Sequence, residues 1–377
     1  MKVLVDLRKL SKRPSGIGIY SYEFIKAVLA LSNDIRFIAV TDVEESIQIK
    51  ELKNLGLSII SYNKEVNKNF EVIKYSFFTQ KIINNVKPDV FWQPNNISPI
   101  KIKNPYGKVI TTIHDIFPLT SKENYSFLYR TYFKCCLGKT INMSDGIIYV
   151  SNFTKKQVNL LYKKTLSMKD FISYNISNNI NGRETSLEKD ISNKSECIKE
   201  NDYFFFVGNI EKRKGVDILI EAFNRYRQEG GNKKLFIAGG MRDNSIKLMI
   251  DESNKKYNAI EYKGYITSDE KEVLLKKCSS FIFPSRAEGF GIPPLEAISF
   301  NKPCILSDIE VFREVFGETV NYFHLENDFE GSVENLKNML FEYKDNTYIN
   351  NKGILQKYSS QNLGNKFLKF LNDLVNN

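Results

Sequence analysis

Two periodicities of apolar residues alternate along this chain, and the alternation predicts a repeated order of strand and helix. Short runs of β-branched and aromatic residues are separated by longer segments in which apolar residues recur three and four positions apart. The runs predict buried strands, and the longer segments predict amphipathic helices. Strands that alternate with helices are typical of parallel sheets covered on both faces. We therefore expect an α/β fold.

The same order occurs twice, on either side of a polar stretch. In the first half we expect strands at 2–7, 36–41, 58–62, 89–93, 108–114, 146–151 and 171–175, and helices from residue 17 and at 70–86, 125–143 and 154–162. In the second half we expect strands at 203–207, 235–238, 260–263, 281–283 and 304–306, and helices at 216–228, 245–256, 269–277 and from Pro293.

The polar stretch between the halves has no apolar period, which indicates a linker. We predict a first domain over 1–180, a linker over 181–202 and a second domain over 203–360. A final helix, 361–377, carries an apolar stripe. The sequence leaves open whether this helix packs back on the first domain.

Composition supports two globular domains and excludes several classes. The chain has 377 residues, of which 42% are hydrophobic and 26% charged, as in soluble proteins of two domains. No apolar run approaches the roughly 18 residues of a membrane span. The N-terminus becomes charged too early for a signal peptide. Five cysteines without a paired pattern and two histidines argue against a disulfide framework or a zinc site, so we expect a cytoplasmic protein.

Charge is unevenly distributed between the halves. Residues 1–183 contain 27 Lys and Arg against 14 Asp and Glu, a net charge of +13, whereas the remainder is −3. An acidic partner for the first half is expected. Nucleic acid, an anionic membrane surface and a phosphate-bearing lipid are the candidates, but no aromatic and basic RNA-binding motif accompanies the charge. The helix at 125–143 mixes aromatic and basic residues, and it is either interfacial or packed in the core.

The first candidate site is a strand, glycine loop and helix between residues 281 and 308. Glu288 lies on the loop, and Glu296 lies in the first turn of a helix opened by Pro293 and Pro294, which suit that position. Such a loop falls at the carboxyl edge of an α/β sheet, where ligands bind. The alternative is that both glutamates are solvated carboxylates.

Three further segments follow expected strands. Gly208 makes the turn after the strand at 203–207. Arg213 and Lys214 come after it, either as a solvated turn or as a clamp for a diphosphate. His114 follows another strand, as a cleft residue or as a satisfied structural histidine. Ser15 and Gly16 follow the first strand, but this loop lacks a full dinucleotide-binding GxGxxG motif.

Taken together, these segments resemble the retaining glycosyltransferases of family four, which have the GT-B fold. The spacing within EGFGIPPLEA is similar to that family's E-x7-E signature, and VGNIEKRKG, LIEAF, SNFTKKQV and SGIGIYSYE are similar to further blocks in the same order. The resemblance implies two Rossmann-like α/β/α domains facing across a cleft. His-Asp followed by a nearby proline is similar to mannosyl- and rhamnosyl-transferring members of bacterial surface polysaccharide synthesis.

The resemblance also implies a role for each candidate residue. Glu288 would contact the hydroxyls of the donor sugar, Glu296 the ribose, and Arg213 and Lys214 the departing diphosphate, while His114 would lie beside the sugar. The remaining donor-binding positions would be Ser15, Gly16, Gly208, Asn209, Phe290, Gly291 and Ile292. Two positions depart from the family pattern: Ser15 precedes Gly16 where many members have two glycines, and Asn209 replaces an arginine.

The implied reaction is a retaining transfer of a hexose, with mannose favoured, from a GDP-, UDP- or dTDP-sugar. The acceptor would be a saccharide or a lipid-linked saccharide of O-antigen, capsule or exopolysaccharide, reached at the inner face of the cytoplasmic membrane. No Asp-x-Asp is present, so the resemblance implies metal-independent chemistry without a cofactor. The alternative function is a non-catalytic GT-B protein that binds nucleotide sugars or polyanions.

Overall fold

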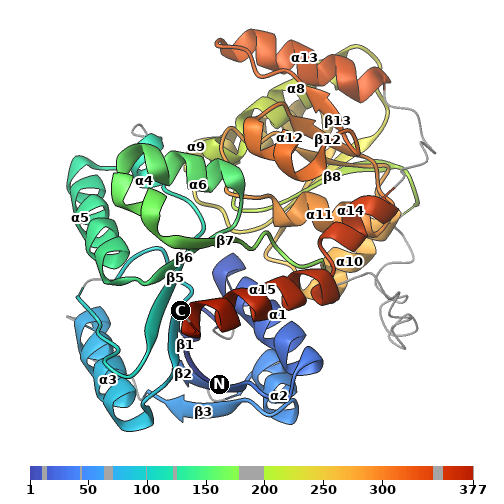
Figure 1. Cartoon of the computed structure of the whole chain (residues 1–377). Coiled ribbons are helices and arrows are strands. Elements are labelled where there is room, and N and C mark those ends of the chain that lie inside the picture. Colours follow the sequence, from blue (N-terminus) through green and yellow to red (C-terminus); the bar gives the residue numbers. More distant parts are fainter. Residues whose placement is uncertain are drawn as a thin grey trace. The chain divides into compact units, whose positions relative to one another are not determined.

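The computed structural model describes residues 1–10, 15–42, 45–62, 71–98, 100–121, 125–177, 199–342 and 351–376. The chain divides into two compact units, Met1–Asn178 with Lys357–Asn377, and Asn179–Gln356. Each unit contains one parallel sheet with helices around it (Figure 1). The linker expected at 181–202 lies mostly outside the described residues.

The first unit is built on a seven-stranded sheet in which every pairing is parallel. Its strands, in sheet order, are β3 (Ser58–Ser61), β2 (Arg36–Thr41), β1 (Lys2–Asp6), β4 (Val90–Gln93), β5 (Lys108–Ile113), β6 (Gly146–Tyr149) and β7 (Lys169–Ile172). The last strand begins and ends earlier than the expected 171–175, and Tyr174 adopts a left-handed φ of 53° just beyond its end. That backbone conformation cannot continue a strand.

Among the described helices of the first unit, five begin after a serine that caps them. The helices of this unit are α1 (Gly16–Leu31), α2 (Ile47–Asn54), α3 (Glu71–Val86), α4 (Phe117–Thr120), α5 (Phe127–Met143), α6 (Asn152–Leu161), a 3₁₀ turn η2 (Lys163–Ser167) and α15 (Ser360–Val375). Ser126 and Ser151 accept hydrogen bonds from Tyr129 and Thr154 and so set the first residues of α5 and α6. The expected starts at 125 and 154 were each two residues away from these.

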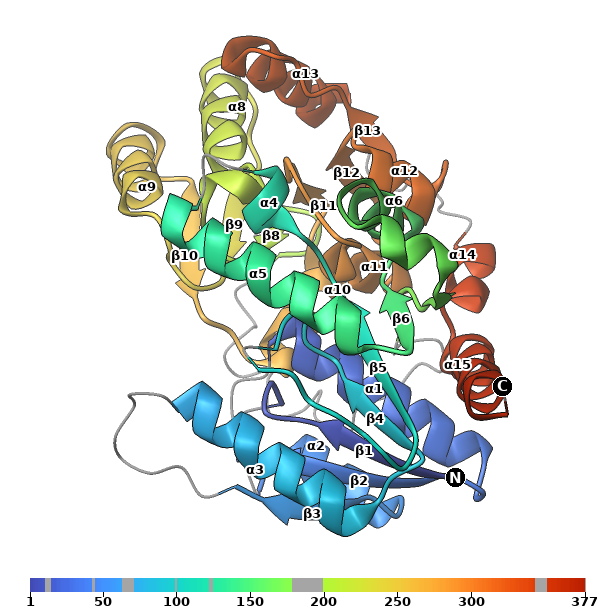
Figure 2. The ribbon, with the colours of Figure 1, turned by 60° about the vertical axis from the view of Figure 1, so that its left-hand side comes forward.

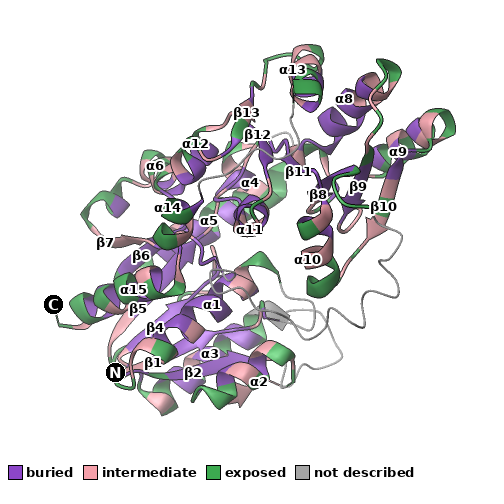
Figure 3. Ribbon diagram, turned by 90° about the vertical axis from the view of Figure 1, so that its right-hand side faces the viewer, coloured by how far each residue is buried: buried purple, intermediate pink, exposed green. Residues whose placement is uncertain are grey.

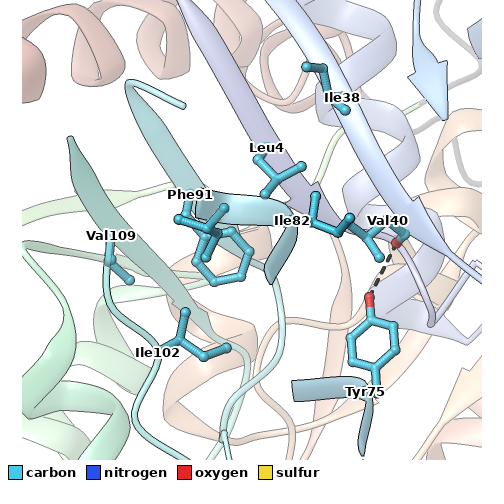
Figure 4. Close-up of a cluster of buried hydrophobic side chains, with 9 residues drawn as sticks. Leu4, Ile38, Val40, Tyr75, Ile82, Phe91, Ile102 and Val109 are labelled. Carbon is cyan, nitrogen blue, oxygen red and sulfur yellow. Dashed lines mark hydrogen bonds between the residues drawn. The ribbon is translucent and has the colours of Figure 1, made fainter. Parts of the chain in front are cut away.

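Side chains of the strands pack against helices on both faces of this sheet. Leu4, Phe91 and Val109 from three neighbouring strands form one cluster with Tyr75 and Ile82 of α3 (Figure 4). Strands that are covered on both faces are apolar at successive positions. This explains why their sequences read as continuous apolar runs rather than as alternating ones.

The C-terminal helix α15 belongs to the first unit, where it lies beside α1 (Figure 2). Phe367 is fully buried. Its ring centroid lies 5.3 Å from that of Phe24 in α1 and 5.0 Å from that of Trp92 in β4. The apolar stripe of the helix is therefore buried against α1 and the sheet.

The second unit has a six-stranded sheet, also parallel throughout. Its strands, in sheet order, are β10 (Ile260–Gly264), β9 (Lys234–Ala238), β8 (Tyr203–Val207), β11 (Ser280–Phe283), β12 (Cys304–Ser307) and β13 (Asn321–Phe323). Its helices are a 3₁₀ turn η3 (Lys212–Lys214), α8 (Val216–Gln228), α9 (Asn244–Tyr257), α10 (Ser268–Lys277), α11 (Ile292–Ser299), α12 (Glu310–Phe316), α13 (Phe329–Glu342) and α14 (Lys352–Lys357). The central strands are buried while the helices expose one side (Figure 3).

Each sheet has one point where the strand order reverses. The chain adds strands outward from β1 to β3 and then returns to place β4 on the other side of β1. In the second sheet β11 returns beside β8 in the same way. Loops that leave the carboxyl ends of two such strands diverge to opposite faces, and ligands of open α/β sheets bind there.

Most expected elements are confirmed within two residues, and the expected α/β class is confirmed. Sequence reading missed the short elements α2, α4, α12 and β13 and the helices α13 and α14. Among the described helices, none has both the length and the apolar character required to cross a bilayer.

Replacing Phe367 with alanine should destabilise the first unit by about 3–5 kcal/mol, because it removes a fully buried aromatic ring. Trp92 is the single tryptophan of the chain and contacts Phe367 directly, so its fluorescence during urea unfolding measures the effect. The exposed Lys366 on the same helix provides a matched control, and Lys366→Ala should shift the midpoint little. Equal shifts for the two variants would contradict the packing of α15.

Candidate active site

The pairing of β8 with β11 brings together two loops that are about seventy residues apart in sequence. Phe204 lies opposite Ser280, and Phe205 lies opposite Phe281. The loop after β8 contains Gly208, Asn209 and η3, and the loop after β11 contains Glu288. Both leave the carboxyl edge at the switch point of the second sheet, as ligand-binding loops do.

Lys214 and Glu288 form the ion pair that joins these loops. Lys214 Nζ lies 2.5 Å from Glu288 Oε1, and the two side chains are 14% and 9% exposed. Ser285 Oγ donates a second hydrogen bond to the same carboxylate oxygen at 2.7 Å. The alternative that Glu288 is a solvated carboxylate is therefore wrong. Two charges buried in this way depend on each other, because each would be costly to leave unpaired.

The Arg213 guanidinium is bonded to protein atoms and is mostly shielded from solvent. Its Nη2 lies 2.6 Å from Glu211 Oε1, and its Nη1 donates to the carbonyl oxygen of Ala287 at 2.9 Å. The alternative of a solvated basic turn is therefore wrong for Arg213 as well as for Lys214. Arg213 and Lys214 are thus each paired with a glutamate, Arg213 with Glu211 on its own loop and Lys214 with Glu288 on the neighbouring loop.

Two glycines are required by the close approach of the loops. Gly215 follows Lys214 with a φ of 68°, and a Cβ atom added there would lie 1.9 Å from the carbonyl oxygen of Pro284. Gly291 precedes α11 with a φ of 106°, and its added Cβ would meet the ring of Phe312 at 2.9 Å. The lack of a side chain at Gly291 is thus needed for packing of the loop itself.

Glu296 has its own basic partner. Lys271 Nζ of α10 lies 2.5 Å from Glu296 Oε1, and both side chains are about one-third exposed, at 28% and 30%. The two glutamates of the signature therefore belong to two separate ion pairs. This separation is compatible with two separate tasks in ligand binding.

The other expected donor-binding residues flank this centre. Gly208 is half-buried and Asn209 is exposed directly after β8. Phe290 is 3% exposed, so its side chain serves the core of the unit. Ile292 is the first residue of α11. If these residues contact a ligand, Phe290 would do so through its backbone.

In the first unit, His114 directly follows β5 and is held from several sides. Its backbone N–H donates to Asn96 Oδ1 at 2.7 Å, and its ring lies edge-on to Tyr20 with centroids 4.9 Å apart. Ring Nε2 lies 3.0 Å from the carbonyl oxygen of Pro94. A carbonyl oxygen can only accept, so Nε2 carries the proton.

Burial lowers the pKa of His114 from its usual value to about 4, and the Pro94 hydrogen bond opposes the shift only in part. The ring is therefore neutral near pH 7, with Nδ1 as an unprotonated acceptor. His114 combines the two alternatives. Its Nε2 is bonded within the protein, as in a structural histidine, and its unprotonated Nδ1 can accept a hydrogen bond, as a cleft residue would.

Ser15 and Gly16 lie at the start of α1, and both are exposed. Ser15 Oγ accepts a hydrogen bond from the N–H of Gly18 at 3.2 Å. Ser15 therefore acts as the cap of α1.

Sequence reasoning missed the residues that support the glutamates and the histidine. These are Ser285, Lys271 and Asn96, together with an ion pair between Asp217 and Arg286. Ser285 lies three residues before Glu288, so its position in the turn was a usable signal. The others come from distant segments and gave none. No group of three His, Cys, Asp or Glu residues with metal-binding placement occurs among the residues that the structure describes.

Residues 188–356 match the family model described as Glycosyl transferases group 1. The chain is 23% identical over 358 residues to the O-antigen chain mannosyltransferase RfbU of Salmonella typhimurium, covering 89% of this chain and 91% of RfbU. It is 22% identical over 330 residues to O-antigen chain mannosyltransferase B of Escherichia coli, covering 84% and 85% of the two chains.

Solved structures of similar fold cover nearly the whole chain. Anabaena Alr3699/HepE, in complex with UDP and glucose, aligns with a TM-score of 0.75 at 17% identity, over 99% of this chain and 100% of that one. WaaG, a glycosyltransferase involved in lipopolysaccharide biosynthesis, aligns with a TM-score of 0.67 at 14% identity, over 99% and 97%. At these low sequence identities, the TM-scores establish the fold and nothing finer. Residues 188–356 are therefore similar to glycosyl transferases group 1, and the two parallel-sheet units have the GT-B fold of these neighbours.

Proposed function

We propose that this protein is a retaining glycosyltransferase that moves a hexose from a nucleotide-diphosphate sugar to a saccharide acceptor. The observation that supports it most is the buried Lys214–Glu288 pair at the switch point of the second sheet, within the residues that match glycosyl transferases group 1. A cation and an anion on adjacent loops match the two parts of such a donor: the diphosphate and the sugar hydroxyls.

In this reaction the bond between the anomeric carbon and the diphosphate breaks, and negative charge grows on the leaving phosphate oxygen. The acceptor hydroxyl oxygen bonds to the anomeric carbon on the same face, and its proton passes to that leaving phosphate oxygen. Lys214 would meet that charge, as preorganised cations do at developing anions. Glu288 would turn from Lys214 to accept hydrogen bonds from the sugar hydroxyls. Because the donor brings both an anion and hydroxyl groups, neither buried charge would lose its partner during the exchange.

The other candidate residues would support binding of the same donor. Glu296, paired with Lys271 through one oxygen, would accept hydrogen bonds from the ribose hydroxyls through the other. Arg213 would support the loop after β11 and add positive potential near the diphosphate. His114, neutral and unprotonated at Nδ1, would accept a hydrogen bond from the donor sugar rather than act as an acid. Gly16 would contribute its backbone N–H to the phosphates or the acceptor. Ser15 would lie beside it, with its own N–H donating to the carbonyl oxygen of Lys9 at 3.3 Å.

We propose mannose as the sugar and a lipid-linked saccharide as the acceptor, in synthesis of O-antigen, capsule or exopolysaccharide. Two relatives that align over most of their length are named O-antigen chain mannosyltransferases, which supports this choice. The donor would be a GDP-, UDP- or dTDP-sugar. We further propose that the reaction needs neither metal nor cofactor, with fixed cations meeting the diphosphate charge.

We propose that the protein works at the inner face of the cytoplasmic membrane through α5. Phe127 and Leu128 at the start of this helix are 74% and 80% exposed, and Tyr129 and Tyr132 are 44% and 46% exposed. The helix contains no Asp or Glu and carries Arg130, Lys134 and Lys139. Exposed apolar and aromatic residues among cations suit an anionic lipid surface.

Lys214→Ala and Glu288→Gln should each lower kcat/KM for transfer from a GDP-, UDP- or dTDP-sugar by roughly 10²-fold or more, since each removes a contact made to the reacting groups. Product formation and anomeric configuration are read by NMR, with EDTA present throughout. Lys234→Ala provides the control, because Lys234 also pairs with a glutamate, Glu261, but at the surface.

Near-normal transfer by either variant with an intact circular dichroism spectrum would contradict the assigned roles. Donor binding by the wild type without any transfer would favour the alternative of a non-catalytic nucleotide-sugar-binding protein. Binding of polyanions without nucleotide selectivity would favour the polyanion-binding alternative.

The low pKa of His114 predicts how stability depends on pH. The folded value of about 4 lies below the unfolded value of roughly 6.5, so the unfolded chain binds more protons between these values. This part of the stability is therefore complete above pH 6.5 and is lost as pH falls toward 4. Urea unfolding monitored by Trp92 fluorescence should show a smaller loss between pH 7.5 and 5 in His114→Gln. His324→Gln, at an exposed histidine of the second unit, should change nothing, and an unaltered pH dependence in His114→Gln would exclude the buried neutral ring.

Sedimentation with phosphatidylglycerol-containing vesicles at low salt should pellet the wild type, and a Phe127→Ser/Leu128→Ser variant should pellet several-fold less. The reason is the loss of two exposed apolar side chains from α5. Leu248→Ser is the matched control, because Leu248 is 62% exposed on α9 of the second unit. Absence of wild-type binding, or equal loss in the control, would contradict a membrane surface on α5.

A further inference from the structure

A second ion pair joins the same two loops beside Lys214 and Glu288. Arg286, on the loop after β11, binds Asp217 in the first turn of α8 through both guanidinium nitrogens, with Nη1–Oδ1 at 2.6 Å and Nη2–Oδ2 at 2.9 Å. Asp217 is 7% exposed although it is charged. Bidentate pairing of this kind fixes orientation as well as distance.

Backbone contacts reinforce the pair from both sides. The N–H of Arg286 donates to the carbonyl oxygen of Arg213 at 2.9 Å, and Arg213 donates in return to the carbonyl oxygen of Ala287 at 2.9 Å. The Arg286 guanidinium also donates to the carbonyl oxygen of Lys212. The two loops are thus tied by reciprocal bonds, with Gly215 allowing backbone contact at Pro284.

Lys214 and Glu288 lie within two or three residues of these bonds. Arg213 precedes Lys214, Asp217 follows it by one helical turn, and Arg286 and Ala287 directly precede Glu288. Little chain is left between the tied points and the two charged side chains. The position of the glutamate loop relative to the lysine turn is therefore determined by the Arg286–Asp217 pair and its backbone bonds.

We infer that Arg286 and Asp217 are positioning residues for transfer: they hold the Glu288 loop at the distance from Lys214 at which sugar hydroxyls and diphosphate are met together. This inference rests on the proposed function of the Lys214–Glu288 centre. We assign neither residue a contact with the reacting atoms. Displacement of a catalytic group by about 1 Å can cost on the order of 10²-fold in rate. Loss of the pair should therefore lower kcat much more than it weakens donor binding.

Another bidentate arginine–aspartate pair in the same unit joins residues that are close in sequence. Arg313 binds Asp308 at 2.7 and 2.9 Å, but the partners lie five residues apart around the start of α12. Arg286 and Asp217 lie 69 residues apart and connect the loops of β8 and β11. Arg313→Lys therefore provides a control, because it alters the same kind of arginine–aspartate pair at a place where the pair does not connect the loops of β8 and β11.

The test compares Asp217→Asn, Arg286→Lys and the control Arg313→Lys in the full-length protein. We expect kcat for transfer to fall about 10- to 100-fold in the first two, while KM for the donor and Kd for GDP and UDP change less than about threefold, because Lys214 is retained. Hydrogen exchange of the free protein should become several-fold faster in the peptide that spans residues 284–291. The control should match the wild type in every measurement.

Unchanged kcat in folded Asp217→Asn would overturn the inference. Parallel losses of kcat, nucleotide affinity and melting temperature would also overturn it, since they would make the pair a general structural element. Hydrogen exchange separates this inference from the proposed function. A wild type without transfer activity would refute the proposed function, and unaltered exchange at 284–291 in both variants would refute the positioning role by itself.

Discussion

The parallel pairing of β8 with β11 is the constraint on which the candidate active site depends. It fixes the starting points of two loops that the sequence separates by about seventy residues, and it places them where the strand order of the sheet reverses. Loops that diverge from such a point leave room at the sheet edge for a ligand. The ion pair between Lys214 and Glu288 forms only because this pairing brings the loops together.

The main feature of the candidate site is a pair of buried charges, Lys214 and Glu288. Removing an ammonium and a carboxylate from water costs more than most pairs recover, so a buried ion pair is weak evidence for stability. We interpret the Lys214–Glu288 pair as a site that exchanges partners. In the ligand-free protein each charge satisfies the other, and a donor carrying both phosphate and hydroxyls can replace both contacts at once. Ser285, also bonded to Glu288, would remain in place during the exchange.

The first unit has the same topology. At its carboxyl edge His114 is held uncharged by burial, Ser15 caps the first turn of α1, and Asp6 at the end of β1 pairs with Arg8 at 2.7 Å. The second unit places charge pairs on the two adjacent loops of its switch point. This arrangement fits a division in which the second unit meets the charged donor. The basic surface of the first unit, including α5, would then serve the acceptor.

The sequence by itself determined the order of strands and helices, because burial on both faces of a parallel sheet and helical periodicity are local patterns. It also determined the E-x7-E loop, whose glycines and prolines act within a few residues. Only the tertiary structure decided how the charges pair. It assigned Lys214 to Glu288 and Lys271 to Glu296, and it engaged Arg213 with Glu211 and Ala287. It also fixed the tautomer of His114 through the carbonyl of Pro94. Most of these partners lie on different loops, and sequence periodicity carries no information about which loops a sheet brings together.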